Sequence, residues 1–379
     1  VTANVMYVDA GGNLEDDKNK LTSVKEALPI TGLEDLFFNI TNETGELKFL
    51  KKDAFKVSKA PVMTRESNRQ AVLLSVVSPQ LKQNNDDPIF DKYKGKISDT
   101  VKKILKEKLK ISNDKLDIEP TKNGYNFLGK GRGGLDLVLD LCKRSVPVKG
   151  DAGFFFYQTK SGFKFKSINE LVSQKPEFTL VYFGGFKNDM TEDNNDNKIM
   201  MPPRFEKDQD VIKSLKGGVY RSRNIFFDPR TFCYQEVTYD ISKEGVKKTL
   251  GGAPPFADDV KSFTKTFHHI LDVGSLDSNP STEINNDPRE WQASSVMRYN
   301  LLHSQVVHVQ IPCNLKLEAG NVVKMEIEST SSDKEEGAKD EQQSGNYLIL
   351  NLCHHFTDRR SITSLTLVRD TYGIKRSKD

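Results

Sequence analysis

The stretch Leu-Glu-Ala-Gly-Asn-Val-Val-Lys-Met-Glu-Ile at residues 317–327 decides the fold. After the turn at Gly320-Asn321, apolar Val323, Met325 and Ile327 alternate with charged residues. The residues before the turn alternate in the same way. A period of two that is broken by a Gly-Asn turn is what a β-hairpin with one buried face requires.

A second hairpin is predicted directly after the first. Leu348, Leu350 and Leu352 alternate with polar residues up to the polar turn at 357–360, and a further apolar run leads back from it. Strands of about 6 to 10 residues are of ordinary length. Region 299–372 is therefore predicted to form a small antiparallel barrel or sandwich.

Length and composition limit the number of domains and the classes of protein to which the chain can belong. A chain of 379 residues is too long for one ordinary core, so two to four domains are expected. Charged residues make up 29% and hydrophobic residues 36%, and the net charge of +3 is too small for a dedicated nucleic-acid binder. No apolar run reaches the length of a membrane span and no signal peptide is expected, so no membrane insertion is predicted.

The chain is predicted to have an α+β, mainly β fold, with two small antiparallel, tube-like β-barrel domains, an intervening α+β domain and an inserted irregular segment. Residues 219–239 are expected to form a hairpin that completes one barrel with the strands of 299–372, and one helix is expected near 259–271 within the insertion. The predicted parts are an N-terminal arm (1–28), a first barrel (29–95), the α+β domain (96–212), a second barrel (213–242 and 296–373), the insertion (243–295) and a C-terminal tail (374–379).

Two helix starts are predicted within the α+β domain. Ser98 is placed to cap a helix in which Val101, Ile104 and Leu105 share one face, and its many lysines are expected on the solvated side. Ser167 and Glu170 have the spacing of a capping box.

The clearest apparent motif for chemistry is Gly129-Lys130-Gly131-Arg132-Gly133-Gly134, which matches the G-x-G-x-x-G pattern of dinucleotide sites. Its context differs from those sites, because the preceding strand is short and polar and no alternating β and α pattern surrounds it. A glycine-rich turn that leads into a helix is the favoured interpretation, and a nucleotide-binding enzyme is kept as an alternative.

The sequence patterns that suggest a metal site also lack the residues or the spacing that such a site requires. Asp193, Asn195 and Asn197 resemble a calcium loop, but lysine and arginine stand where glycine and glutamate are needed. Neighbouring residues of a strand face opposite ways, so Cys353-His354-His355 cannot converge on one ion, and His268-His269 has no partner at zinc spacing. The four cysteines, Cys142, Cys233, Cys313 and Cys353, are predicted to be free buried thiols of a protein from a reducing compartment. No catalytic, cofactor-binding or metal-binding residue and no cofactor are predicted.

Several separated phrases resemble the baseplate hub protein of contractile-tailed bacteriophages of the T-even type. They begin with Leu-Pro-Ile-Thr-Gly at 28–32 and Lys-Gly-Lys-Ile-Ser-Asp at 94–99, and continue with Gly-Phe-Phe-Phe-Tyr-Gln-Thr at 153–159. The resemblance resumes at Arg-Tyr-Asn-Leu-Leu (298–302) and includes 317–323, 344–349 and 364–370, but it does not extend to 1–26 or 243–295.

This resemblance implies a non-enzymatic virion component located in the tail baseplate. Such a protein would be a homotrimer with two related barrels per subunit, which adapts three-fold to six-fold symmetry around a channel through which DNA passes without specific binding. Its partners would be the central spike protein, the tail tube proteins and the baseplate wedge proteins. The hub of a contractile secretion or bacteriocin apparatus is the alternative within the same class.

Overall fold

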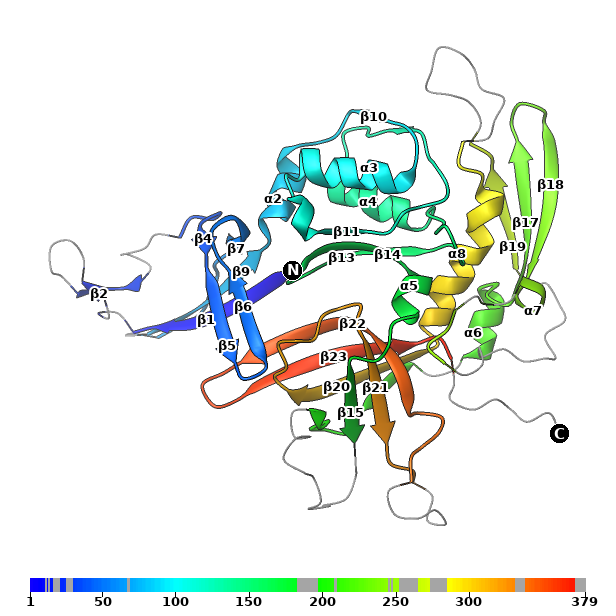
Figure 1. Ribbon diagram of the computed structural model, residues 1–379. Coiled ribbons are helices and arrows are strands. Elements are labelled where there is room, and N and C mark those ends of the chain that lie inside the picture. Colours follow the sequence, from blue (N-terminus) through cyan, green and yellow to red (C-terminus); the bar gives the residue numbers. More distant parts are fainter. Residues whose placement is uncertain are drawn as a thin grey trace.

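The structure is a computed structural model, and strands dominate it (Figure 1). Two curled sheets of five and six strands are the largest sheets, and a few helices lie beside them. The expectation of a mainly β chain with some helices is thereby confirmed. The residues that the structure describes are 1–10, 12, 14–15, 21–24, 30–66, 69–182, 197–207, 210–244, 246, 248–251, 265–272, 285–330 and 338–371.

The five-stranded sheet comes from the first part of the chain. Its order is β1-β9-β7-β4, and β8 also pairs with β9. The buried core beneath it includes Phe55, Val57 and Val72. The hairpin of β5 and β6 packs Phe38 and Phe49 edge-on against Phe55. The strands are β1 (Thr2–Asp9), β4 (Asp35–Leu36), β5 (Phe38–Asn42), β6 (Gly45–Phe49), β7 (Phe55–Lys59), β8 (Val62–Arg65) and β9 (Gln70–Val77), with a short pair β2 (Leu14–Glu15) and β3 (Leu21–Thr22).

The prediction of an N-terminal arm over 1–28 is wrong for Thr2–Asp9, which form β1. All eight residues of β1 pair antiparallel with β9, from Thr2 opposite Val77 to Asp9 opposite Gln70. Every second residue of β1 is partly buried, and Val5 and Tyr7 pack on the core of the sheet. The residues after β1 are mostly polar, and for this reason the sequence did not indicate the alternation of exposed and partly buried residues in β1.

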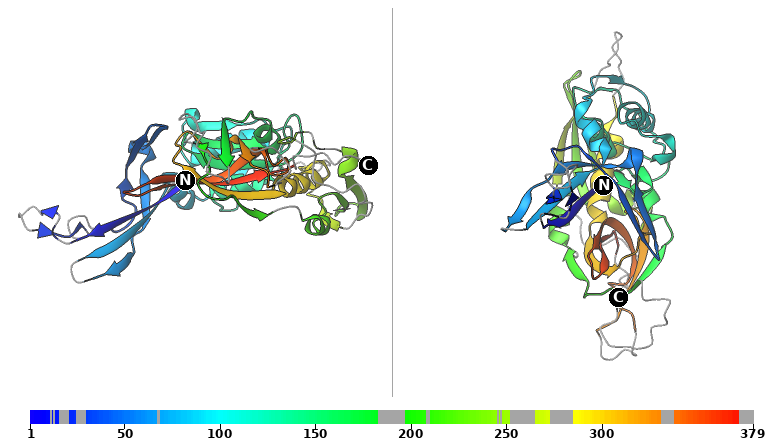
Figure 2. Two further views of the ribbon diagram at one scale, coloured as in Figure 1. Left: turned by 90° about the horizontal axis from the view of Figure 1, so that it is seen from below. Right: turned by 90° about the vertical axis from the view of Figure 1, so that its left-hand side faces the viewer.

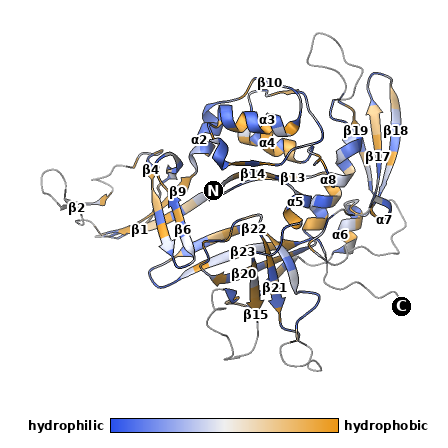
Figure 3. Ribbon diagram, in the orientation of Figure 1, coloured by the Kyte–Doolittle hydropathy of each residue, from blue (hydrophilic) through white to orange (hydrophobic). Residues whose placement is uncertain are grey.

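The α+β region packs α3 and α4 against a three-stranded sheet of order β11-β14-β13. Its core includes Val101, Ile104 and Leu105, which confirms the predicted helix face. Orange and blue segments alternate along both helices, as amphipathic packing requires (Figure 3). The elements are α2 (Pro79–Asp86), β10 (Lys92–Tyr93), α3 (Ile97–Lys103) with a π-helical turn (Ile104–Lys108), β11 (Leu116–Ile118), β12 (Phe127–Leu128), α4 (Gly134–Cys142), β13 (Phe154–Thr159), β14 (Gly162–Ser167) and α5 (Ile168–Val172).

One of the two predicted helix caps is confirmed. The Ser167 hydroxyl accepts a hydrogen bond from the Glu170 amide at the start of α5. Ser98 is not a cap, because α3 begins one residue before it and the Ser98 amide donates to the Thr121 hydroxyl instead. A single buried contact with another loop decides this helix start.

The six-stranded sheet contains all the predicted C-terminal strands, but only the second predicted hairpin, β22 with β23, forms. The first is wrong, because β20 pairs with β23 and β16, and β21 pairs with β22 and β15. The order of the sheet is β15-β21-β22-β23-β20-β16, and β15 runs parallel to β21, so the sheet is not purely antiparallel as expected. A bridge between Val181 and Lys198 links the first strand to the segment that leads into the last one. Val307, Val323 and Leu365 pack inside this curled sheet. The strands are β15 (Phe178–Tyr182), β16 (Arg204–Lys207), β20 (Gln305–Pro312), β21 (Val322–Ile327), β22 (Gly345–Phe356) and β23 (Ser361–Arg369).

The expected pairing of the 219–239 hairpin with the C-terminal strands is wrong. Strands β17 (Arg221–Asp228) and β18 (Cys233–Asp240) form a separate three-stranded sheet with β19 (Lys265–Ile270), and β16 takes the place beside β20. Two short helices, α6 (Val211–Lys216) and α7 (Ile241–Glu244), flank this hairpin. A hairpin pattern predicts the two strands but not the sheet they join.

The expected insertion at 243–295 contains regular structure. Residues 259–264 of the helix expected near 259–271 lie outside the described residues. The prediction is wrong for the rest, because the β-branched and aromatic residues of β19 form a strand parallel to β17. A 15-residue helix, α8 (Pro288–Leu302), crosses from this segment into the predicted second barrel. Asp287 caps it and proline occupies its first turn, a start signal that is visible in the sequence.

The five-stranded sheet and the three-stranded sheet of β17, β18 and β19 lie at opposite ends of the molecule. Figure 1 and the left view of Figure 2 both place β1 at one end and β17–β18 at the other, with the helices and the six-stranded sheet between them. None of the described helices is long and apolar enough to cross a membrane. The division into domains stays a prediction.

Candidate functional site

The glycine loop at 129–134 joins β12 to α4, as predicted, and its amide groups bond to the protein itself. The Gly129 amide donates to the carbonyl of Asp91 at 3.0 Å and the Gly131 amide to that of Ile89 at 2.8 Å. At the start of α4, the Leu135 amide donates to the Asn84 side chain at 2.7 Å. Three of the amides that could cradle a phosphate in a dinucleotide site are therefore already used.

Close packing explains the glycines of this loop. A Cβ atom at Gly129 would lie 2.3 Å from the carbonyl oxygen of Ile89, and one at Gly133 would lie 2.5 Å from the Asn84 amide group. Asn84 comes from α2 and is buried. The loop thus permits α2 and the residues after it to approach α4, which supports the interpretation as a turn.

The Cys353-His354-His355 segment of β22 faces two ways, as predicted. Cys353 and His355 are exposed, whereas His354 points inward and its Nδ1 lies 2.9 Å from the Thr363 hydroxyl and 3.9 Å from the Cys313 sulfur. Burial, with a smaller effect of the Lys160 charge, lowers the pKa of His354 to about 4. Burial raises the pKa of the Cys313 thiol, which disfavours the reactive thiolate.

We expect His354 to make the chain less stable in mild acid. The folded chain holds this imidazole neutral down to about pH 4, whereas the unfolded chain takes up a proton near pH 6.5. Stability is therefore complete above pH 6.5 and falls as the pH drops from 6.5 toward 4. Urea unfolding at pH 7.5 and pH 5 should show a smaller pH effect in His354→Gln than in the wild type. The exposed His355→Gln variant is the control, and an equal effect in both variants would contradict this role.

The other histidine pair does not assemble a metal site. His269 stacks on Phe226 with ring centroids 5.0 Å apart, while His268 is exposed on the opposite face of β19. Asp193 and Asn195 lie outside the described residues, and Lys198 takes part in the bridge to β15. Within the described ranges no cluster of three or more histidine, cysteine or acidic residues could hold a metal ion.

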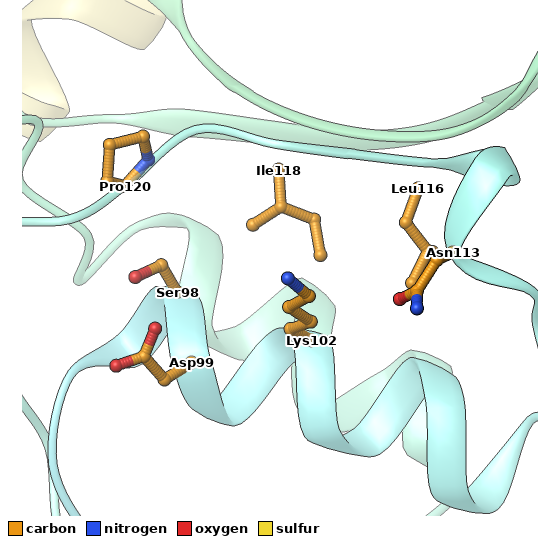
Figure 4. A pocket seen from close by; sticks show the side chains of 7 residues that line it. All are labelled: Ser98, Asp99, Lys102, Asn113, Leu116, Ile118 and Pro120. Atoms are coloured by element: carbon orange, nitrogen blue, oxygen red, sulfur yellow. The ribbon is translucent and has the colours of Figure 1, made fainter.

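A pocket of about 240 Å³ lies between α3 and β11 (Figure 4). Its two charged side chains, Asp99 and Lys102, are exposed to solvent, and no histidine or cysteine lines it. Lys102 extends toward Ile118 in Figure 4. The arrangement offers neither a nucleophile with a base nor a set of metal ligands, and the lysines around it belong to the solvated helix side. The lining residues are Ser98, Asp99, Lys102, Asn113, Leu116, Ile118 and Pro120.

A buried ion cluster joins three distant parts of the chain, and no local sequence pattern indicates it. Arg298 of α8 is fully buried, and its Nη1 lies 3.3 Å from Asp370 Oδ2 just after β23. Its Nε lies 3.9 Å from Asp151 Oδ2 in the loop before β13. The other Asp370 oxygen accepts a hydrogen bond from the Leu250 amide at 3.0 Å. This geometry holds elements together and provides no open space for a substrate.

Comparison with known proteins identifies the fold. No protein-family model and no curated protein sequence matches the chain. The crystal structure of a tail protein from Neisseria meningitidis MC58 matches with a TM-score of 0.52 and 10% identity, over 96% of this chain and 91% of that chain. The 43 kDa tail protein of prophage MuSo2 from Shewanella oneidensis matches with a TM-score of 0.51 and 8% identity, over 97% of this chain and 90% of that chain.

A component of the Escherichia coli type VI secretion system has a lower TM-score of 0.44, with 10% identity over 99% of this chain and 72% of that chain. The two tail-protein matches extend over nearly the whole of both chains. The chain therefore has the fold of tail proteins, which confirms the resemblance noted in the sequence at the level of the fold.

Proposed function

We propose that the chain is the central hub of a contractile-tail baseplate. The observation that carries this proposal is the match to two tail proteins, which covers at least 96% of this chain and at least 90% of each tail protein. Large insertions or missing domains would have shortened the match. The five-stranded sheet and the six-stranded sheet supply two curled units per chain. In the proposed hub each is one barrel-like unit.

In this role the chain forms a homotrimer around the DNA channel. Three copies with two units each present six positions, so one side of the ring fits a six-fold tail tube and the other a three-fold central spike. Tail tube, spike and baseplate wedge proteins are its partners, and the virion baseplate is its location. A hub has a structural role, which agrees with the buried ion cluster and the filled glycine loop.

The oligomeric mass tests the proposal directly. Light scattering of the purified chain, alone and with a purified central spike protein, should give a particle of three times the chain mass of 42.8 kDa. A monomer or dimer under both conditions would count against the hub.

The location in the particle provides an independent test. Antibody labelling of purified virions should mark the baseplate end of the tail. Labelling of a DNA-free contractile apparatus with no labelled virions in the same host would assign the chain to a secretion or bacteriocin machine instead.

A further inference from the structure

Strand β1 leaves a complete row of backbone groups free for pairing. It ends the five-stranded sheet, and within the described residues only β9 pairs with it. The Ser78 amide donates to the Val1 carbonyl, and the Leu73 amide points away from β1, toward Pro61. Antiparallel pairs alternate between bonded and unbonded positions. The amides and carbonyls that point to the open edge are therefore those of Thr2, Asn4, Met6 and Val8.

Strand β18 has an open edge of the same kind. It ends the three-stranded sheet, and β17 alone pairs with it within the described part of the chain. The Ile241 amide donates to the Tyr220 carbonyl, and the Phe227 carbonyl accepts from Leu271 on the opposite side of β17. By the same alternation, the groups that point to this edge are those of Tyr234, Glu236, Thr238 and Asp240.

Exposed apolar side chains adjoin both edges. On β1, Met6 is 69% exposed and Val8 59% exposed. On β18, Tyr234 is 74% exposed, and the register aligns it with Phe227 and with Ile270, which is 75% exposed. Open edges with apolar neighbours promote association with another strand. Neither strand contains a proline, a lysine or a bulge that would prevent this.

We infer that β1 of one copy pairs with β18 of the next copy in the ring. The two edges are eight residues long, each offers four outward residues, and they lie at opposite ends of the molecule (Figures 1 and 2). One chain therefore cannot pair its own two edges. Head-to-tail pairing uses both edges of every copy, and it closes in a ring when the rotation between copies is that of a trimer, whereas pairing of β1 with β1 stops at a dimer and leaves β18 open. This inference rests on the proposed trimeric hub and names the contact that forms it.

Proline substitution tests the hydrogen bonds of each edge. Met6→Pro removes an outward amide, and Met6→Ala removes the same side chain but keeps that amide. Proline is tolerated on an open edge, so the monomer should stay folded. We expect the concentration for half assembly to rise by about tenfold or more in Met6→Pro relative to Met6→Ala. Thr238→Pro should weaken assembly in the same way relative to Thr238→Ala, and circular dichroism should show native strand content in all four.

Crosslinking tests which strands meet. The background carries Cys233→Ser and Cys353→Ser, which remove the two exposed thiols. A chain with both Met6→Cys and Thr238→Cys should give covalent dimers and trimers with a bismaleimide reagent, and chains with either cysteine alone should give none. Covalent dimers of the Met6→Cys chain would overturn head-to-tail pairing, as would trimers that are unaffected by Met6→Pro. A wild-type chain that never forms trimers would instead contradict the proposed hub itself.

Discussion

Replacement of Asp370 by alanine is expected to destabilise the folded chain by about 3 to 5 kcal/mol. Asp370 and Arg298 are both fully buried, so the substitution leaves an arginine charge in the interior with only the more distant Asp151 carboxylate nearby. The Leu250 amide also loses its acceptor. Burial raises the pKa of Asp370 although Arg298 opposes this effect, so the cost of removing the carboxylate from water is large.

Urea unfolding at pH 7 measures this effect. The fluorescence of Trp291, the one tryptophan of the chain, reports on α8, where Arg298 lies. Asp358→Ala, at the exposed turn before β23, is the matched control and should change stability by less than about 0.5 kcal/mol. If Asp370→Ala unfolds like the control, the carboxylate does not neutralise Arg298 in the folded chain.

A double variant separates the loss of charge from the loss of packing. Arg298→Met combined with Asp370→Leu removes both charges and keeps apolar volume, so it should recover most of the stability that Asp370→Ala loses. The single Arg298→Met variant should be strongly destabilised, because it leaves the buried carboxylate unpaired. Additive losses in the double variant would show that the two groups do not interact.

Substitution of Gly129 by alanine should cost about 1 to 3 kcal/mol or prevent folding. The added Cβ would lie 2.3 Å from the carbonyl oxygen of Ile89, and the nearby atoms include rigid backbone. The expected loss requires no nucleotide, since it follows from packing between the loop and the residues after α2. Thermal unfolding of the purified variant measures it.

Gly45→Ala is the control for this glycine substitution. A Cβ at Gly45 would meet Leu315 at 3.7 Å, an ordinary contact, and Gly45 does not have a positive φ. The control should therefore unfold near the wild-type temperature. A Gly129→Ala variant of wild-type stability would contradict the packing explanation. A melting temperature that rises with added dinucleotide in the wild type but not in this variant would restore the nucleotide site.

The sequence alone determined the strands in the C-terminal part of the chain. The period of two before and after Gly320-Asn321 predicted β20 and β21, and the alternation around 357–360 predicted β22 and β23, because alternation states which face of a strand is buried. It did not predict that β20 pairs with β23 and not with β21. The start of α5 at Ser167 was readable for a related reason, since a cap depends on residues three positions apart. The start signal of α8 at Asp287-Pro288 was equally local, although the polar residues around it favoured an irregular segment.

Only the tertiary structure decided which strands meet and which charges pair. Alternation along β17 and β18 predicts a buried face, but it does not state that β19 rather than β20 lies beside them. β1 became a strand because β9, about 70 residues away, buries one of its faces. Arg298 and Asp370 are 72 positions apart, so no local pattern links them. Such contacts depend on the burial of the whole chain, whereas hairpins and caps depend on a few neighbouring residues.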